Sequence, residues 1–365
     1  MRKRIEKVLN ASPGLKGKEI AKNIGEDKKV VNAFLHEHKD IFNQDSNYCW
    51  CLNKADEIKI ELDSNSWVDA DSFENSLQSS ISPLDAEESH VVFIVPEKCS
   101  VLLEPACLML ALCNQLCDIG KAVTIDFTAC RSALTFFDRI GFFDSLNSNC
   151  IVLPNKPKSS RAVKYKGGNK NLVEFGLIDP VNSDQDLNAA DKILINQLTE
   201  SFVRLVDTDY EDVASVIFSE LIGNIKRHSQ TKLWGIAGLQ KYAGRNNHIQ
   251  TIVSDSGVGI ATTLKTGIQS HYPDLFMRSE SEDYDLFLVK EALTKGQISR
   301  SGKGHGLGFG ITTQKAMKFN ASLSVRQESF SLKFFYNNNQ LVNIVHRQNL
   351  TKIHGTHLCF DFDID

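Results

Sequence analysis

The stretch SELIGNIKRHS, residues 219–229, lies inside a longer segment, 209–230, whose apolar residues recur at the spacing of an amphipathic helix. Glu220, Asn224 and His228 follow one another at four-residue intervals, so they form a row along one edge of the predicted apolar face. A half-buried carboxylate, amide and imidazole lose solvation unless each finds a partner. The row therefore either makes structural hydrogen bonds inside the protein or faces a ligand.

A second segment, HIQTIVSDSGVGI at 248–260, is predicted to be an apolar strand that ends in Asp255 and turns at Gly257 and Gly259. A strand of this kind delivers a carboxylate, which accepts a hydrogen bond from an amino group. The glycines have no side chains, so the backbone there can approach a flat ligand closely. Taken alone, this pattern is only moderately specific for a ligand site.

A third segment, GKGHGLGFG at 302–310, precedes a helical pattern that starts near residue 311. Consecutive backbone N–H groups at a helix start bind anions such as phosphates. The segment matches neither the Walker A pattern nor the dinucleotide fingerprint, because no Gly-Lys-Ser/Thr ends it and no strand runs directly into it. A flexible loop without a ligand is the alternative. The last segment, KIHGTHLCFDFDI at 352–364, is a predicted terminal strand that contains Gly355 and Thr356.

In this order the four segments resemble the nucleotide-binding boxes of the GHKL ATPase superfamily, which includes gyrase B subunits, MutL proteins, Hsp90-type chaperones and the ATP-binding domains of histidine kinases. The resemblance covers roughly residues 172–362 and implies a Bergerat-type α/β sandwich over 172–365. By this resemblance Asn224 coordinates Mg²⁺ that bridges the ATP phosphates. Asp255 accepts a hydrogen bond from the adenine amino group, and Thr356 supports that contact.

The same resemblance assigns the other site residues. Gly257 and Gly259 leave room for the base, and a lid over residues 261–303 closes on the phosphates. Contacts to the phosphates are then expected from Lys303, Gly304, Gly306, Leu307 and Gly308. Glu220 matches the residue that orients and deprotonates the attacking water in hydrolysing members. We therefore predict an ATPase that requires Mg²⁺ and has Glu220 as its catalytic residue.

Two other functions stay open. The box from Glu220 to His228 is also similar to that of anti-sigma-factor kinases, which makes a protein serine/threonine kinase the alternative to an ATPase. A regulatory adaptor that binds nucleotide without turnover is the third interpretation. A sensor histidine kinase is disfavoured, because the His36–Glu37 pair lies in the N-terminal segment and lacks the context of a phospho-acceptor box. No role for His228 follows.

Residues 1–53 are predicted to form a winged-helix-like unit of three helices and a hairpin. Up to residue 40 there are ten Lys or Arg against six Asp or Glu, and the third helix carries Lys28, Lys29 and Asn32. Such a helix can enter a DNA major groove. Winged helices also bind proteins, and a surplus of four positive charges does not decide between the two. DNA or a protein is therefore the expected partner of this unit.

The middle of the chain changes character twice. Residues 54–89 contain ten acidic residues against two lysines and are predicted to be an acidic linker. Residues 90–155 show the order β-α-β-α-β, and the strand at 123–127 with its polar turn at 128–132 resembles STAS-type domains. Residues 156–171 are basic and rich in Gly, Pro and Ser, so a second linker is expected.

Composition sets the remaining bounds. The chain has 365 residues, of which 42% are hydrophobic and 24% charged, and a net charge of −4. This length fits two or three domains of α/β (α+β) class, and the charge excludes a globally basic nucleic-acid binder. The most apolar stretch, 101–117, is interrupted by Glu104 and Asn114, so neither a signal peptide nor contact with a membrane is expected. Nine irregularly spaced cysteines suit free thiols in the cytoplasm. A homodimer on ATP binding is also expected.

Overall fold

The protein divides into two compact units, Met1–Ile58 with Glu88–His90 and Lys59–Glu87 with Val91–Asp365. Both contain helices and strands, which confirms the mixed α/β class at that level. Among the described residues, every helix is too short or too polar to cross a membrane. The computed structural model describes residues 1–12, 14–39, 41–52, 57–63, 67–78, 81–181, 187–243, 247–281, 283–295, 298, 320–338 and 340–364.

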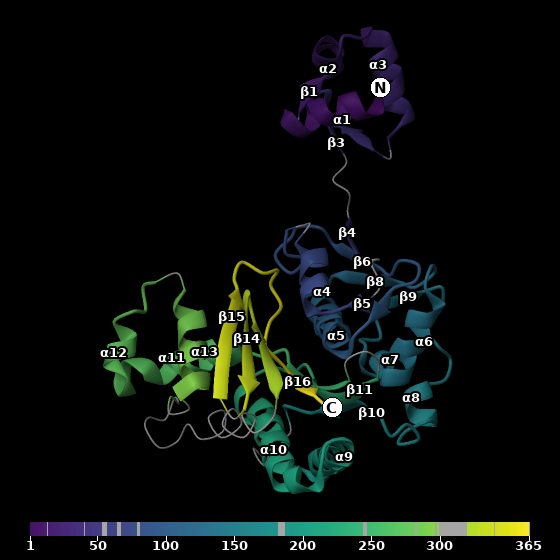
Figure 1. Cartoon of the computed structure of the whole chain (residues 1–365). Helices are drawn as coiled ribbons and strands as arrows, with labels where there is room; N and C mark the ends of the chain where they lie inside the picture. Colours follow the sequence, from purple (N-terminus) through teal and green to yellow (C-terminus); the bar gives the residue numbers. More distant parts are fainter. Residues whose placement is uncertain are drawn as a thin grey trace. The chain divides into compact units, whose positions relative to one another are not determined.

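The first unit consists of three helices and a small antiparallel sheet (Figure 1). Apolar side chains of the helices pack around Phe42 and Trp50 of the strands, both fully or almost fully buried. The three helices and the hairpin expected from residues 1–53 are present. Their bounds are α1 (Arg2–Ala11), β1 (Leu15–Lys16), α2 (Gly17–Ile24), α3 (Lys28–Glu37), β2 (Phe42–Gln44) and β3 (Cys49–Leu52), in the sheet order β1-β3-β2.

The middle segment forms a four-stranded sheet of order β4-β6-β8-β9 and a two-stranded parallel sheet of β5 and β7. The β-α-β-α-β order expected over 90–155 is present as β6, α5, β8, α6 and β9. The helix α8 lies inside 156–171, where a linker was expected. The elements are β4 (Glu57–Glu61), β5 (Trp67–Val68), α4 (Ala70–Leu77), β6 (His90–Ile94), β7 (Ser100–Val101), α5 (Leu103–Asp118), β8 (Ala122–Asp126), α6 (Arg131–Ile140), α7 (Phe142–Ser145), β9 (Ile151–Leu153) and α8 (Arg161–Lys164).

The segment 54–89 is not the continuous linker that its acidic composition predicted, because it contains β4, β5 and α4. Ile58 and Ile60 alternate with polar residues along β4, and both are buried. Phe73 and Leu77 lie four residues apart on α4 and are likewise buried. Glu61 of β4 and Asp71 of α4 are exposed, whereas Glu74 of α4 is buried, and net charge alone concealed this amphipathic pattern.

The C-terminal segment forms an antiparallel seven-stranded sheet of order β10-β11-β12-β16-β13-β14-β15. The last strand inserts between β12 and β13, which brings Thr356 beside Asp255. The elements are β10 (Leu172–Ile178), α9 (Ala189–Leu205), η1 (Thr208–Tyr210), α10 (Glu211–His228), β11 (Gly235–Tyr242), β12 (His248–Asp255), α11 (Gly259–His271), α12 (Pro273–Phe276), α13 (Tyr284–Lys295), β13 (Ala321–Gln327), β14 (Phe330–Asn337), β15 (Gln340–Arg347) and β16 (Thr356–Asp363).

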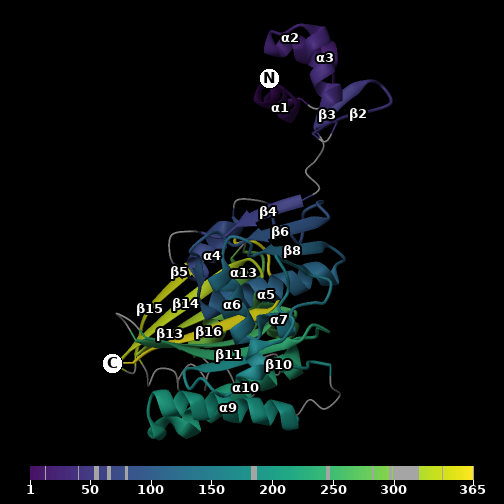
Figure 2. The same cartoon turned by 90° about the vertical axis from the view of Figure 1, so that its right-hand side faces the viewer.

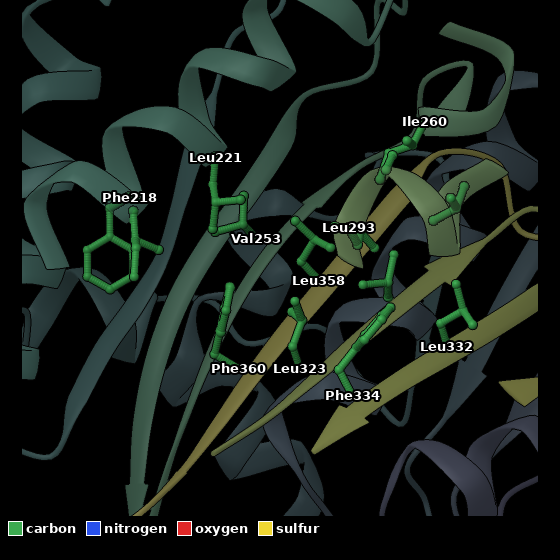
Figure 3. Packing of buried hydrophobic residues seen from close by; sticks show 14 of the residues in the cluster. Phe218, Leu221, Val253, Ile260, Leu293, Leu323, Leu332, Phe334, Leu358 and Phe360 are labelled. Carbon is green, nitrogen blue, oxygen red and sulfur yellow. The ribbon is translucent and has the colours of Figure 1, made fainter. Parts of the chain in front are cut away.

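This large sheet is covered on both faces. Helices α9 and α10 lie against one face and α5 lies against the other (Figure 2). On the α10 side, Val253 and Leu358 belong to the main hydrophobic core (Figure 3). On the α5 side, Ser254 Oγ lies 2.7 Å from His357 Nδ1, and Ser254 also forms a hydrogen bond with Cys107 of α5. Burial of consecutive residues along β12 follows from this double cover.

Candidate functional site

Asp255 and Thr356 lie opposite each other at the ends of β12 and β16. Each residue is only 8% exposed. Burial raises the pKa of the Asp255 carboxyl to about 6, against the lowering effect of hydrogen bonds from the backbone N–H groups of Gly257 and Thr356. The N–H of Gly257 donates to Asp255 Oδ1 at 2.7 Å. The strand ends thus hold a desolvated carboxylate beside a hydroxyl, which suits recognition of an amino group.

Gly257 is required for a close approach between two segments of backbone. A Cβ at Gly257 would lie 2.0 Å from the carbonyl oxygen of Ser229, the residue that follows α10. The N–H of Val258 donates to that same oxygen at 2.9 Å. The turn after Asp255 is therefore joined directly to the C-terminal end of α10. The sequence suggested that Gly257 makes room for a base, and the structure adds this packing requirement.

Two further glycines beside these strand ends have positive φ angles, Gly259 in the turn after β12 and Gly355 directly before β16. Gly259 has φ +79° and Gly355 has φ +106°, values that L side chains rarely adopt. A Cβ at Gly355 would also lie 1.9 Å from the carbonyl oxygen of Asp255. Both glycines therefore shape the strand ends on which Asp255 and Thr356 sit.

Glu220 and Asn224 share a single cation on α10. Arg227 Nη2 lies 3.4 Å from Glu220 Oε2 and 3.3 Å from Asn224 Oδ1. The side chains of Glu220 and Arg227 are 35% and 38% exposed, so water screens this ion pair and it stabilises the fold little. Asn224 Nδ2 is buried, and the described residues offer it no hydrogen-bond partner. This NH2 group is a hydrogen-bond donor, so it suits an acceptor atom of a ligand.

Arg227 is the site residue that sequence reasoning missed. It follows Asn224 by three residues and Glu220 by seven, which places it on the same edge of the helix. A Cβ at Gly223 would lie 2.9 and 3.0 Å from its two terminal nitrogens, so the glycine gives the guanidinium room to lie along the helix. The four-residue intervals that selected the row from Glu220 to His228 pass over Arg227, although a helix also brings residues three and seven apart together.

His228 ends α10 and is half-buried. The structure assigns it no role in the site. The predicted phosphate-binding residues lie outside the part of the chain that the structure describes, as does the helix expected near residue 311; these residues are Lys303, Gly304, Gly306, Leu307 and Gly308. The described part of the site therefore comprises the α10 row, the strand ends and the glycine turn between them.

The described side chains can be tested against a magnesium nucleotide. No cluster of three His, Cys, Asp or Glu that could hold a metal occurs among them. Mg²⁺ is often bound by one or two protein oxygens, with phosphates and water completing its six ligands. The Asn224 amide oxygen is a ligand of that type, and Asp255 supplies an acceptor for the base. The chemical types of Asn224 and Asp255 therefore fit a magnesium nucleotide.

Comparisons with known proteins add little to this geometry. No family model matches the chain, and no curated protein matches it. Among solved structures, a mycobacterial sensor histidine kinase, MprB, is similar over 42% of this chain and 71% of that chain, with 18% sequence identity and a TM-score of 0.22. This is a weak structural likeness, and it carries no information on activity.

Proposed function

We propose that residues 172–362 form a GHKL-type ATP-binding module of Bergerat type and that the protein hydrolyses ATP with Mg²⁺. The observation that carries this proposal is the buried Asp255 opposite Thr356, on a glycine turn bonded to the end of the helix that bears Glu220 and Asn224. A base-recognising carboxylate and a polar helix edge are the two ends of a nucleotide site. Direct packing of the turn on α10 keeps them in one site.

Each residue has a separate role in this proposal. Asp255 accepts a hydrogen bond from the amino group of the base, supported by the hydroxyl of Thr356. Asn224 holds Mg²⁺, which supplies charge neutralisation on the phosphates. Glu220 orients the attacking water and accepts its proton. We also propose that Lys303 and the glycine loop contact the phosphates; this part of the proposal rests on the sequence resemblance.

Arg227 competes with a metal cation for Asn224 Oδ1, because the guanidinium repels a second positive charge beside that oxygen. Its hydrogen bonds to Asn224 and Glu220 are long, 3.3 and 3.4 Å. Partly exposed pairs of this kind contribute about 1 kcal/mol or less, so exchange of Arg227 for another cation costs little. Arg227 therefore acts as a replaceable counter-ion of the site.

A protein serine/threonine kinase is the second candidate. It is favoured by the α/β segment 90–155, which we propose to be STAS-like and whose helix α5 packs on the same sheet. A nucleotide-binding adaptor without turnover is the third. In each case we propose a cytoplasmic protein whose winged-helix-like unit, residues 1–53, binds DNA or a protein and whose ATP-bound form is a homodimer.

ATP labelled at the γ-phosphate separates these functions. Hydrolysis is supported if the full chain releases free phosphate and the Glu220→Ala variant does not. Label retained on protein supports a kinase, and bound ATP with neither product supports an adaptor. Glu200→Ala is the matched control, because Glu200 is an exposed glutamate on the neighbouring helix α9. Unchanged ATP affinity in Asp255→Asn contradicts the base site itself.

A further inference from the structure

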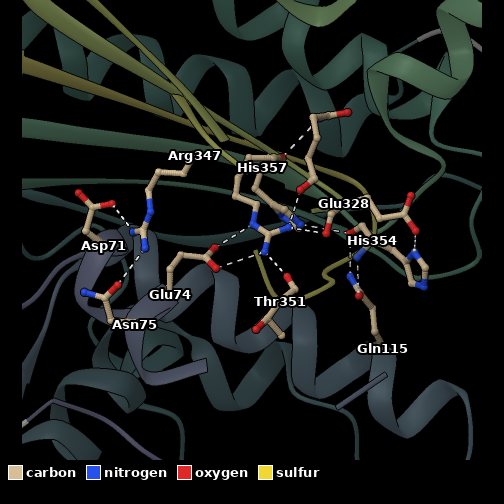
Figure 4. Close-up of polar contacts among 11 residues, drawn as sticks. Asp71, Glu74, Asn75, Gln115, Glu328, Arg347, Thr351, His354 and His357 are labelled. Carbon is tan, nitrogen blue, oxygen red and sulfur yellow. Dashed lines mark hydrogen bonds and ion pairs between the residues drawn. The ribbon is translucent and has the colours of Figure 1, made fainter. Parts of the chain in front are cut away.

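The side chain of Gln115 on α5 forms three hydrogen bonds with the C-terminal segment, and its contact with His354 is drawn in Figure 4. Its Nε2 donates to Ser256 Oγ at 2.9 Å and to the carbonyl oxygen of His354 at 2.8 Å. Its Oε1 accepts from the N–H of His354 at 2.9 Å. Gln115 is only 3% exposed. Both the NH2 group and the carbonyl oxygen of the Gln115 side chain therefore bind the C-terminal segment.

These bonds lie where the pairing of β12 with β16 stops. The last paired residues are Asp255 and Thr356. Ser256 follows Asp255 directly, and His354 precedes Thr356 by two residues. The amide of Gln115 binds both the N–H and the C=O of His354, as a neighbouring strand would. It therefore continues the hydrogen bonding beyond the end of the ladder and orders both strand ends.

Gln115 acts from behind the candidate site. Its helix α5 lies on the face of the sheet opposite α10 (Figure 2), whereas Glu220 and Asn224 belong to α10. A ligand held by Asp255 and α10 lies on the other side of these strand ends. Gln115 is thus placed to affect a ligand through the residues it holds.

A second contact of the middle segment reaches the same region. Glu74 of α4 and Arg326 of β13 form a buried ion pair with 2.8 Å between Oε1 and Nε. Arg326 also donates to the carbonyl oxygen of Thr351, three residues before His354. Helices α4 and α5 together therefore hold the chain that leads into β16.

We propose that Gln115 is a positioning residue for base recognition, which fixes Asp255 and Thr356 by holding Ser256 and His354. This inference rests on the proposed function, because it takes the ligand of Asp255 to be the base of ATP. It assigns the middle segment a part in nucleotide selectivity. A purely structural glutamine would contribute to stability and leave selectivity unchanged.

Gln115→Leu tests the proposal in the full chain. ATP is compared with ITP, whose base has an oxygen in place of the amino group. Loss of three hydrogen bonds is expected to weaken ATP binding about tenfold while ITP binding changes less, so the preference for ATP falls. Hydrogen exchange of the backbone amides at 254–258 and 353–357, measured without nucleotide, is expected to become faster.

Asn114→Leu is the matched control on the same helix. Asn114 donates to Ser145 O at 3.0 Å and accepts from the Asn147 N–H at 2.8 Å, so it also loses two bonds without touching the C-terminal segment. Its preference for ATP over ITP is expected to equal that of the wild type. Ser256→Ala removes one bond of Gln115 and gives a smaller change in the same direction, which keeps the test valid if Gln115→Leu does not fold.

The outcomes separate the two proposals. Equal selectivity and equal exchange in wild type and Gln115→Leu overturn the positioning role. Faster exchange with unchanged selectivity also overturns it, because the contact is then structural only. If the wild type binds neither ATP nor ITP, the proposed function fails, and the exchange measurement still shows whether Gln115 orders the strand ends.

Discussion

Lys226 Nζ lies 3.0 Å from Asp191 Oδ2 in an ion pair whose side chains are each only 2% exposed. Asp191 also accepts a hydrogen bond from the N–H of Asn188 at the start of α9, at 2.9 Å. Lys226 follows Asn224 by two residues, about 200° around the helix. The pair thus fixes the rotation of α10 on α9 and directs the row of Glu220 and Asn224 away from α9.

Lys226→Met is expected to lower the free energy of unfolding by about 3 kcal/mol, because it leaves the Asp191 carboxylate buried without its cation. Urea unfolding followed by circular dichroism measures the change. Lys295→Met is the control, since Lys295 pairs with Glu291 on the surface of α13 and such pairs contribute about 0.5 kcal/mol. Equal losses in the two variants would contradict the structural role of the buried pair.

Binding of ATP is expected to weaken as the pH falls from 7.5 to 5, with a midpoint near the Asp255 pKa of about 6. Only the ionised carboxylate accepts a hydrogen bond at both oxygens. The effect on folding has the opposite sign. Because burial raises the folded-state pKa above its ordinary value of 3.8, the ionised group destabilises the fold above about pH 6, and that cost disappears as the pH falls toward about 4.

Dissociation constants measured across this pH range for wild type and Asp255→Asn isolate the carboxylate. The amide does not titrate, so the pH dependence common to both proteins belongs to the nucleotide phosphates and other groups. Binding is the better readout than stability, since burial also raises the pKa of Glu104 to about 7. Parallel curves for the two proteins would show that Asp255 does not contact the ligand.

Elements whose residue spacing shows within one short segment could be predicted from the sequence, and contacts between distant segments could not. The helix around Glu220 followed from its apolar spacing, and the strand that ends in Asp255 followed from its glycine turn. The contact between Gln115 and His354 joins residues 239 positions apart, and no spacing within one element encodes such a pair. The helix α4 was missed because the net negative charge of residues 54–89 concealed the spacing of the buried Phe73 and Leu77. Arg227 was missed although its spacing was visible.

Gly257→Ala is expected to lower the free energy of unfolding by about 2 kcal/mol or more, because its Cβ would overlap the backbone of Ser229. ATP affinity should fall with it, since the same turn carries Asp255. Gly120→Ala is the control: Gly120 has φ +84° with open space around its Cβ position, so backbone strain alone costs about 1 kcal/mol. Thermal unfolding compares them, and a smaller loss for Gly257→Ala would contradict the close approach.

Arg227→Met is expected to lower the Mg²⁺ concentration for half-maximal ATP hydrolysis about fivefold. The reason is competition: the guanidinium occupies Asn224 Oδ1, and a partly exposed pair worth about 1 kcal/mol corresponds to a factor of about five. Phosphate release at a series of Mg²⁺ concentrations measures it. Lys232→Met is the control, since Lys232 pairs with Asp118 away from the α10 row, and its Mg²⁺ requirement should equal that of the wild type. A higher Mg²⁺ requirement in Arg227→Met would instead mean that the arginine binds the phosphates together with the metal.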